Sequence, residues 1–381
     1  MLNNTELKDI TKEKGLRGKR VLLRLDLNVP IEDGKIINDF RIKKSRKVIS
    51  FLHEQGTKTI IISHLGDDDS KSLRPVAEYL QKEFPSLEFV PEVFVDASVI
   101  KKTKDMKEGG ILMLENLRKN PGEKENNPEF AQDLSLLGDI YVNEAFAVSH
   151  REHASIICVP YCMESFIGPV FKAEIEGLGK VLSPLPPLYL ILGGSKISTK
   201  LPLVEKFIDV AENIFLYGAL AHDILHAKGY EIGESLVDKG INIGHLVNNK
   251  KIVVPIDVVV TNKKDGRSIK KIEEINKDDI IYDAGPESIV AIKMATKNAQ
   301  TILWNGPLGN CENGYVQGTE DVAMIISHLP AFTVVGGGDT IAAIQKLGLD
   351  EKFSFLSTGG GAMLEYLAKG TLAGINALTE C

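Results

Sequence analysis

The sequence predicts an α/β protein of two doubly wound parallel-sheet (Rossmann-like) domains joined by a hinge helix. Its length of 381 residues exceeds what one hydrophobic core usually supports. Short β-branched runs alternate with amphipathic stretches, as they do in βαβ units. This alternation stops at the proline-rich segment SPLPPL, 183–188, and then begins again. The restart predicts a second domain of the same class.

Four apolar runs predict the strands of the first domain, at 20–27, 59–65, 110–116 and 139–146. These runs lack the regular alternation of half-exposed strands, so helices should cover both faces of a parallel sheet. Amphipathic stretches such as RIKKSRKVISFLHEQ and PEFAQDLSLLG would supply those helices.

The segment GPVFKAEIEGLGKVL, 168–182, predicts a connecting helix with glycine and proline at its flanks, where a hinge would be placed. We therefore place the first domain at 1–168 and the second at 169–367, with the linker helix 169–182 counted in the second. The C-terminal segment 368–381 is expected to pack back on the first domain.

Seven further runs predict the second domain, and most of them end in glycine. They are LYLILGG (188–194), ENIFLYG (212–218), KIVVPIDVVV (251–260), DIIYDAG (279–285), TILWNGP (301–307), FTVVGGG (332–338) and FSFLSTGGG (353–361).

Composition excludes several classes of protein. The formal net charge of −7 argues against a general nucleic-acid binder, so any anion binding must be local. Neither a membrane-spanning run nor an N-terminal signal peptide is present, and we expect a cytoplasmic protein without membrane partners. The cysteines show no CxxC spacing and are expected to be reduced thiols; Cys158 and Cys162 as zinc ligands would lack two further donors.

Polar residues follow the first-domain strands, at the sheet edge where open parallel sheets bind ligands. In an acidic protein such a gathering of cations would suit a small, multiply charged anion. Scattered surface charges are the plainer interpretation, and His150 and His153 could be metal ligands, although a third donor is lacking. The residues are Asp26, Asn28, Arg41, His64, Arg118, His150, Arg151 and His153.

Glycine marks the strand ends of the second domain. It allows close backbone approach, so that successive amide hydrogens can converge on phosphate oxygens. Each loop alone could be a plain turn, and neither GxxxxGK[ST] nor GxGxxG occurs. Two unlike domains, one for an anion and one for nucleotide phosphates, predict transfer of a phosphoryl group to a small anionic acceptor. The glycine-rich loops are 193–196, 305–307, 336–340 and 359–361.

Eight motifs, in order along nearly the whole chain, strongly resemble the phosphoglycerate kinase family. They are RLDLNVP (24–30), SHLG (63–66), LENLR (114–118), NEAFAVSHREHAS (143–155), LGGSKISTK (192–200), WNGPLG (304–309), VVGGGDT (334–340) and STGGGAMLE (357–365). The resemblance implies a monomeric, hinge-bending glycolytic kinase. It would exchange ATP and 3-phosphoglycerate with ADP and 1,3-bisphosphoglycerate, and would use Mg²⁺ with the nucleotide.

The resemblance also implies roles for individual residues. It makes Asp26, Asn28, Arg41, His64, Arg118 and Arg151 ligands of the phosphoglycerate. It gives catalytic roles to Arg41, Lys196, Lys200, Gly338 and Gly361, with Gly337 and Gly360 beside them as backbone donors. It assigns nucleotide contacts to Gly194, Ser195, Lys200, Gly218, Asn305, Pro307, Glu312, Gly337, Gly338, Asp339 and Thr340, and the metal contact to Asp339.

The chain departs from the family pattern at several places. Asp67 follows SHLG where the family usually has an arginine, which reverses a charge beside the substrate phosphate. Thr199 stands in place of an aspartate, the adenine-side glycine triplet is altered at 217–220, and Asn310 and Cys311 replace an apolar pair. Two alternatives therefore stay open: an acyl-phosphate kinase of another carboxylate, and a weakly active phosphoglycerate-binding protein.

Overall fold

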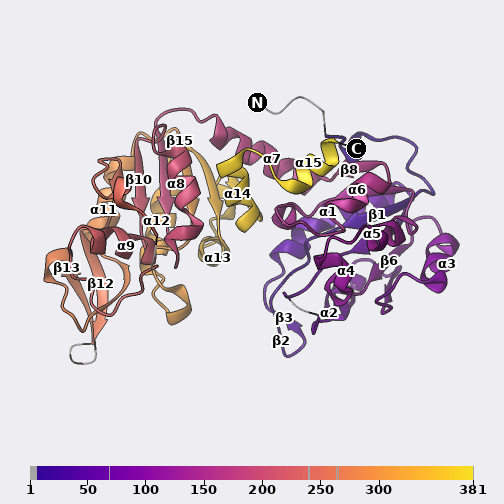
Figure 1. The fold of residues 1–381 in the computed structure, drawn as a ribbon, viewed down its shortest axis with the longest axis horizontal. Coiled ribbons are helices and arrows are strands. Elements are labelled where there is room, and N and C mark those ends of the chain that lie inside the picture. The colour runs from indigo at the N-terminus through magenta and orange to yellow at the C-terminus, as the bar shows by residue number, and fades with distance from the viewer. Residues whose placement is uncertain (1–6, 68, 239–240, 263, 265, 381) are drawn as a thin grey trace. The chain divides into compact units, whose positions relative to one another are not determined.

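The structure, a computed structural model, describes residues 7–67, 69–238, 241–262, 264 and 266–380 (Figure 1). The chain divides into two compact units. The first comprises Met1–Glu176 together with Lys369–Cys381, and the second comprises Gly177–Ala368. The division falls inside helix α7 (Pro169–Leu182), whereas the sequence placed it ahead of this helix at residue 168.

The first unit is built on a parallel six-stranded sheet in the order β5-β6-β4-β1-β7-β8. The central strand β1 (Arg20–Arg24) and its neighbours are buried along nearly their whole length, as the absence of apolar–polar alternation predicts. The other strands are β4 (Lys58–Ile62), β5 (Leu87–Val90), β6 (Ile111–Leu114), β7 (Ile140–Asn143) and β8 (Ser165–Ile167).

Helices complete the first unit. Helix α1 (Phe40–Glu54) follows a short hairpin, and its Ile42, Val48, Ile49 and Leu52 enter the main core. The remaining elements are β2 (Ile31–Glu32), β3 (Lys35–Ile36), α2 (Arg74–Gln81), α3 (Ala97–Asp105), α4 (Pro121–Lys124), α5 (Pro128–Ser135) and α6 (Cys158–Cys162).

The C-terminal helix α15 (Ala373–Thr379) belongs to the first unit and packs against α6 (Figure 1). The backbone N–H of Gly374 donates to the carbonyl of Ser149 at 2.8 Å. A side chain at Gly374 would lie 2.8 Å from the Ile156 methyl group, so only glycine allows this close approach. Both ends of the described chain therefore belong to the first unit.

The second unit contains a parallel six-stranded sheet in the order β11-β10-β9-β15-β16-β17. The strands are β9 (Leu188–Leu192), β10 (Asn213–Leu216), β11 (Ile252–Val253), β15 (Thr301–Asn305), β16 (Phe332–Gly336) and β17 (Phe355–Leu356). Its helices are α8 (Leu201–Phe207), α9 (Ala219–Ala227), α10 (Gly244–Val247), α11 (Pro286–Thr296), α12 (Gln317–Ile326), α13 (Gly338–Lys346) and α14 (Gly361–Lys369).

The second unit also contains a separate antiparallel sheet. It has the order β13-β12-β14, with β12 (Asp257–Asn262), β13 (Gly266–Lys271) and β14 (Ile280–Ala284). The run 251–260 was expected to be a single strand, but Pro255 separates β11 from β12 and the two belong to different sheets. In the part of the chain that the structure describes, no helix is long and apolar enough to cross a bilayer.

Candidate anion and nucleotide sites

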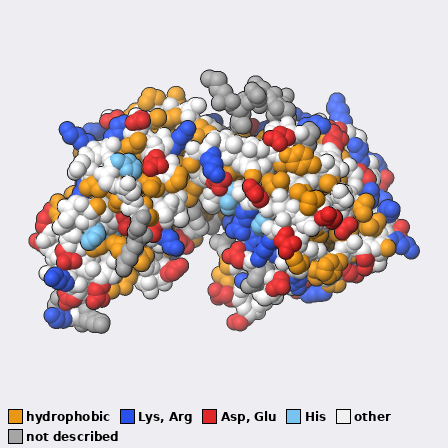
Figure 2. All heavy atoms as spheres, in the orientation of Figure 1, with side chains coloured by type: hydrophobic (Ala, Val, Ile, Leu, Met, Phe, Trp, Pro, Cys, Tyr) orange, Lys and Arg blue, Asp and Glu red, His pale blue; other side chains and the backbone are white. Residues whose placement is uncertain are grey.

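The predicted anion residues gather at one edge of the first sheet because they follow neighbouring parallel strands. Asp26 and Asn28 come after β1, His64 after β4, Arg118 after β6 and Arg151 after β7. Figure 2 shows Lys and Arg side chains gathered beside His side chains on this unit. The carboxyl ends of these strands therefore concentrate positive charge at one place.

Arg41 joins this edge from the first turn of α1. Its Nη1 lies 2.7 Å from Asp26 Oδ2 and donates to the carbonyl of Asn28 at 3.3 Å. The Asn28 side chain in turn accepts a hydrogen bond from the N–H of Gly66 at 2.9 Å. Arg41 is thus held by the loop after β1, with its side chain partly exposed.

His64 is buried and neutral at the centre of the cluster. Burial holds its pKa well below the ordinary value, and the charges of Arg24, Arg118, Arg151 and Arg41 lower it further. Arg24 Nη2 lies 3.4 Å from His64 Nδ1. Because a guanidinium can only donate, Nδ1 is the acceptor and the ring hydrogen is on Nε2. His64 can therefore donate to a bound anion without carrying charge.

Arg24, at the end of β1, supports the cluster and was not predicted from the sequence. It is fully buried, lies 3.6 Å from Glu123 Oε1 and donates from Nε to the Ser155 hydroxyl at 2.8 Å. Glu123 also accepts from the Ser155 hydroxyl at 2.7 Å. The signal available in the sequence was an arginine inside an apolar strand, since a buried charge needs a buried partner.

Arg118 has donors to spare. Its side chain is 1% exposed, and within the described residues its Nε and Nη2 are buried without a hydrogen-bond partner. Burial lowers its pKa, and the nearby Arg151 and Arg24 lower it further. A buried guanidinium with unsatisfied donors favours the binding of an anion.

The alternative that His150 and His153 bind a metal ion finds no support in the described residues. His153 lies beside Glu123, and burial followed by the nearby arginines lowers its pKa to about 4. Among residues 7–380, apart from the few that the structure does not describe, no three His, Cys, Asp or Glu side chains come together to hold a metal ion. Cys158 and Cys162 are free thiols.

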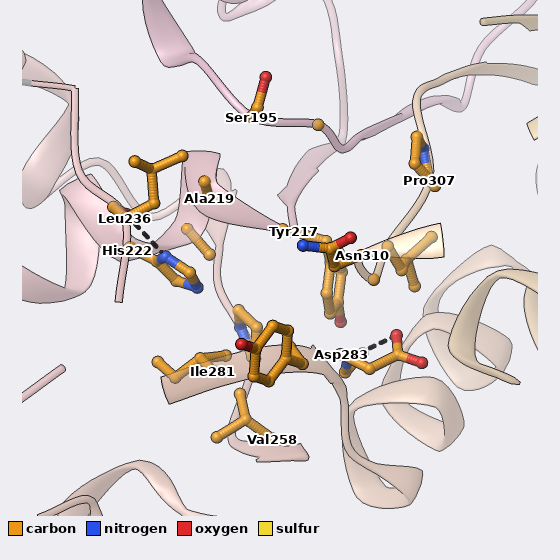
Figure 3. A pocket seen from close by; sticks show the side chains of 18 of the residues that line it. Ser195, Tyr217, Ala219, His222, Leu236, Val258, Ile281, Asp283, Pro307 and Asn310 are labelled. Atoms are coloured by element: carbon orange, nitrogen blue, oxygen red, sulfur yellow. Dashed lines mark hydrogen bonds between the residues drawn. The ribbon is translucent and has the colours of Figure 1, made fainter. Parts of the chain in front are cut away.

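The second unit holds a cavity of about 380 Å³ at the ends of β9, β10 and β15 (Figure 3). Backbone groups and polar side chains line one side of the cavity, and apolar side chains line the other. The predicted nucleotide residues Gly194, Ser195, Gly218, Pro307, Glu312 and Asp339 line it.

Glycine is required where these loops touch. A Cβ at Gly193 would lie 1.9 Å from the carbonyl oxygen of Pro307. Gly306, at φ +94°, would place a Cβ 2.3 Å from the Gly193 carbonyl oxygen. The loops after β9 and β15 therefore pack backbone against backbone, a contact that any side chain would prevent.

The remaining predicted residues lie at the starts of helices and in the loop after β9. Gly337 precedes α13, which begins at Gly338 and includes Asp339 and Thr340 in its first turn, so free N–H groups are available to an anion. Gly361 begins α14 in the same way. The exposed Lys196 lies in the loop after β9.

Lys200 is buried next to Asn305. Its Nζ donates to the Asn305 side-chain oxygen, and burial lowers the lysine pKa to about 8. At neutral pH the ammonium is therefore charged but poorly solvated, and a phosphate group would provide a strong partner.

The apolar wall of the cavity contains residues that sequence analysis missed. Val258 and Ile281 come from the antiparallel sheet, and His222 comes from α9 (Figure 3). His222 Nδ1 donates to the Leu236 carbonyl at 2.8 Å, which leaves Nε2 as a buried acceptor without a partner among the described residues. The ring is neutral, since burial lowers its pKa to about 4.

An arginine-rich anion site in one α/β unit and a glycine-lined cavity in a second together define a phosphotransferase that acts on a small anionic acceptor. Comparison with known proteins identifies the family. The family model described as phosphoglycerate kinase matches residues 10–370. The chain therefore belongs to the phosphoglycerate kinase family.

Individual relatives agree with this. The phosphoglycerate kinase of Dictyoglomus turgidum is 38% identical, over 97% of this chain and 98% of that protein. That of Borreliella burgdorferi is 36% identical, over 98% of this chain and 99% of that protein. The structure of the Coxiella burnetii phosphoglycerate kinase has a TM-score of 0.84 at 34% identity, covering 98% and 99% of the two chains. None of these matches favours the two alternative functions.

Proposed function

We propose that the chain transfers a phosphoryl group reversibly between 1,3-bisphosphoglycerate and ADP, giving 3-phosphoglycerate and ATP in glycolysis and gluconeogenesis. The arginine cluster around the buried, neutral His64 is the observation that carries this proposal. Such a cluster suits an acceptor that is itself multiply charged, as a phosphorylated carboxylic acid is.

The acceptor is assigned to the edge of the first sheet. Arg118 and Arg151 bind its phosphate, and His64 donates from Nε2. Asp26 and Asn28 hold the Arg41 guanidinium in place, as their contacts in the free protein indicate. Arg41 is then positioned to reach the group that is transferred.

The nucleotide is assigned to the cavity of the second unit. Gly194, Ser195, Gly218, Pro307 and Glu312 contact it along the wall. Lys200, with Asn305 beside it, and the helix start at Gly337, Gly338 and Thr340 bind its phosphates.

Catalysis requires positioning and charge dispersal, because phosphoryl transfer needs no protein nucleophile. Arg41, Lys196, Lys200 and the amides at Gly338 and Gly361 surround the charge that develops on the transferred group. The bound substrates must also meet, and we assign this hinge motion to α7, within which the two units divide.

Magnesium is assigned to Asp339. Its carboxylate lines the nucleotide cavity, and Mg²⁺ is commonly held by one or two carboxylates together with substrate phosphates. The donor chemistry therefore fits, and the ion would neutralise phosphate charge. We further propose that the protein is a cytoplasmic monomer, as the family resemblance supports.

A coupled assay with ATP, Mg²⁺ and 3-phosphoglycerate tests the function. Arg41→Ala should lower kcat by about 10²–10³-fold, because it removes a cation from the transferred group. Arg46→Ala is the matched control: it lies on the same helix and pairs with Glu83 away from the site, so it should keep wild-type kcat. Absence of turnover in the wild-type protein, or full activity of Arg41→Ala, would contradict the proposal.

A further inference from the structure

The carboxylate of Asp67 occupies the anion site of the first unit. Its Oδ1 lies 3.0 Å from Arg118 Nη1 and 3.7 Å from Arg151 Nη1. The backbone takes part as well, since the carbonyls of Gly66 and Asp67 accept from Arg118 and Lys124. Residues 66 and 67 thus present acceptors to Arg118 and Arg151, which are assigned to the substrate phosphate, and also to Lys124.

The two partners of this ion pair differ sharply in exposure. The Asp67 side chain is 88% exposed, whereas that of Arg118 is 1% exposed. Asp67 can exchange its arginine partner for water at little cost, because it is already largely solvated. Arg118 has no such alternative, and its Nε and Nη2 donors have no partner in the described part of the chain.

We propose that Asp67 is an intramolecular competitor for the phosphate of the substrate. In the free protein its carboxylate partly neutralises Arg118 and Arg151, and an incoming phosphate must displace it. The phosphate carries more charge and more acceptor oxygens than the Asp67 carboxylate, so it displaces Asp67 from the arginines. Its affinity is nevertheless lower than it would be in a site without Asp67. This inference rests on the proposed function, in that Arg118 and Arg151 are taken to bind the substrate phosphate.

The competing contact belongs to the free protein. Removing it should therefore strengthen ground-state binding and lower KM, with little change in kcat. The nucleotide binds in the other unit, so its affinity should stay the same. These two features distinguish competition at the phosphate from a general loss of negative charge, which would act on both ligands.

Calorimetric titration of 3-phosphoglycerate tests the proposal. Asp67→Asn keeps the shape of the side chain and removes its charge, and we expect binding about two- to fivefold tighter than wild type. The matched control is Asp69→Asn, which removes the same charge from an exposed residue nearby and should change affinity less than twofold. ADP affinity should be equal in all three proteins.

Two results would overturn the proposal: Asp67→Asn binding within twofold of wild type, or binding more weakly. The same titrations with inorganic phosphate separate this inference from the proposed function. If wild type neither binds nor turns over 3-phosphoglycerate, the function fails, but Asp67→Asn should still bind inorganic phosphate more tightly. Equal phosphate affinity in both proteins would then reject the role of Asp67.

Discussion

At the scale of single residues, both sites contain buried ionisable side chains whose pKa values are shifted by burial. Lys200 illustrates this, because burial alone lowers its pKa to about 8. Burial and the neighbouring arginines together lower the pKa values of His64 and Arg118. A bound anion would therefore offset the desolvation cost of the buried cations Lys200 and Arg118 in the free protein.

The Lys200 pKa predicts how nucleotide affinity depends on pH. Below pH 8 the ammonium is charged and available to a phosphate; above pH 8 it loses its proton in the free protein. ADP affinity should therefore be constant near pH 7 and fall above pH 8, approaching tenfold per pH unit. Titrations between pH 7 and 9.5 measure this.

Two variants assign the pH effect to its source. Lys200→Met should bind ADP weakly and without the fall above pH 8. Lys206→Met removes an exposed lysine of the neighbouring helix α8 and should retain the fall. A wild-type affinity that stays constant up to pH 9.5 would show that the Lys200 charge is not used.

The sequence predicted the site residues that follow predicted strands or lie in family motifs, but not those whose role depends on partners distant in sequence. Arg118 and Arg151 come after predicted strands and are visible there as cations, whereas Arg41 lies further along the chain, in the first turn of α1. Arg24 and His222 were missed, because their importance comes from partners that are distant in sequence, such as Glu123 and Leu236. The ion pair of Asp67 with Arg118 likewise could not be predicted, because the sequence shows only that the charge at position 67 is reversed.

At the scale of elements, the sequence predicted most strands of the parallel sheets. It wrongly assigned the runs that contain β12 and β14 to a parallel sheet, whereas they belong to a separate antiparallel one. Continuous apolar runs mark strands such as β1, β9 and β15, which are buried on both faces. β13 reads GRSIKK and is mostly exposed, so its pairing with β12 provides the only evidence that it is a strand. β5 was missed because the exposed Glu88 interrupts its apolar run, and β8 because it has only three residues.

Helix α7 begins at a contact that one glycine makes possible. The Glu144 carboxyl accepts the N–H groups of Val170 and Phe171 at 2.9 and 3.1 Å, and burial raises its pKa to about 8. A Cβ at Gly168 would lie 2.2 Å from Glu144 Oε2. Gly168 is therefore required for Glu144 to cap the helix.

Substitution of this glycine should loosen the start of α7. Gly168→Ala is expected to destabilise the first unit by about 1–3 kcal/mol, because the buried carboxyl must move. Gly179→Ala, within the same helix, meets nothing within 4 Å and should instead stabilise by about 0.5–1 kcal/mol. Denaturant unfolding compares the two; equal effects would reject the steric argument.

At the scale of the whole molecule, the two units should unfold as separable bodies, since each has its own sheet and core. The sequence contains one tryptophan, Trp304, and it is fully buried in β15 of the second unit. Its fluorescence therefore reports on the second unit alone.

Removal of residues 370–381 should separate the two transitions. The deletion removes the buried side chains of Leu372, Ile375 and Leu378, whose burial is worth about 1.5–3 kcal/mol each, and exposes the surface of α6 that α15 contacts. Unfolding followed by far-ultraviolet circular dichroism should gain an early phase, while the Trp304 midpoint stays in place. A parallel shift of both signals would show that α15 stabilises the whole chain.

Because α15 belongs to the first unit, that unit cannot complete its folding until the second unit has been synthesised. The ribosome makes all of Gly177–Ala368 before it reaches this helix, which takes roughly ten to forty seconds at ordinary elongation rates. For that interval the nascent first unit lacks the helix that packs against Ile156 and α6. The half of the protein that emerges first is thus the last to be completed.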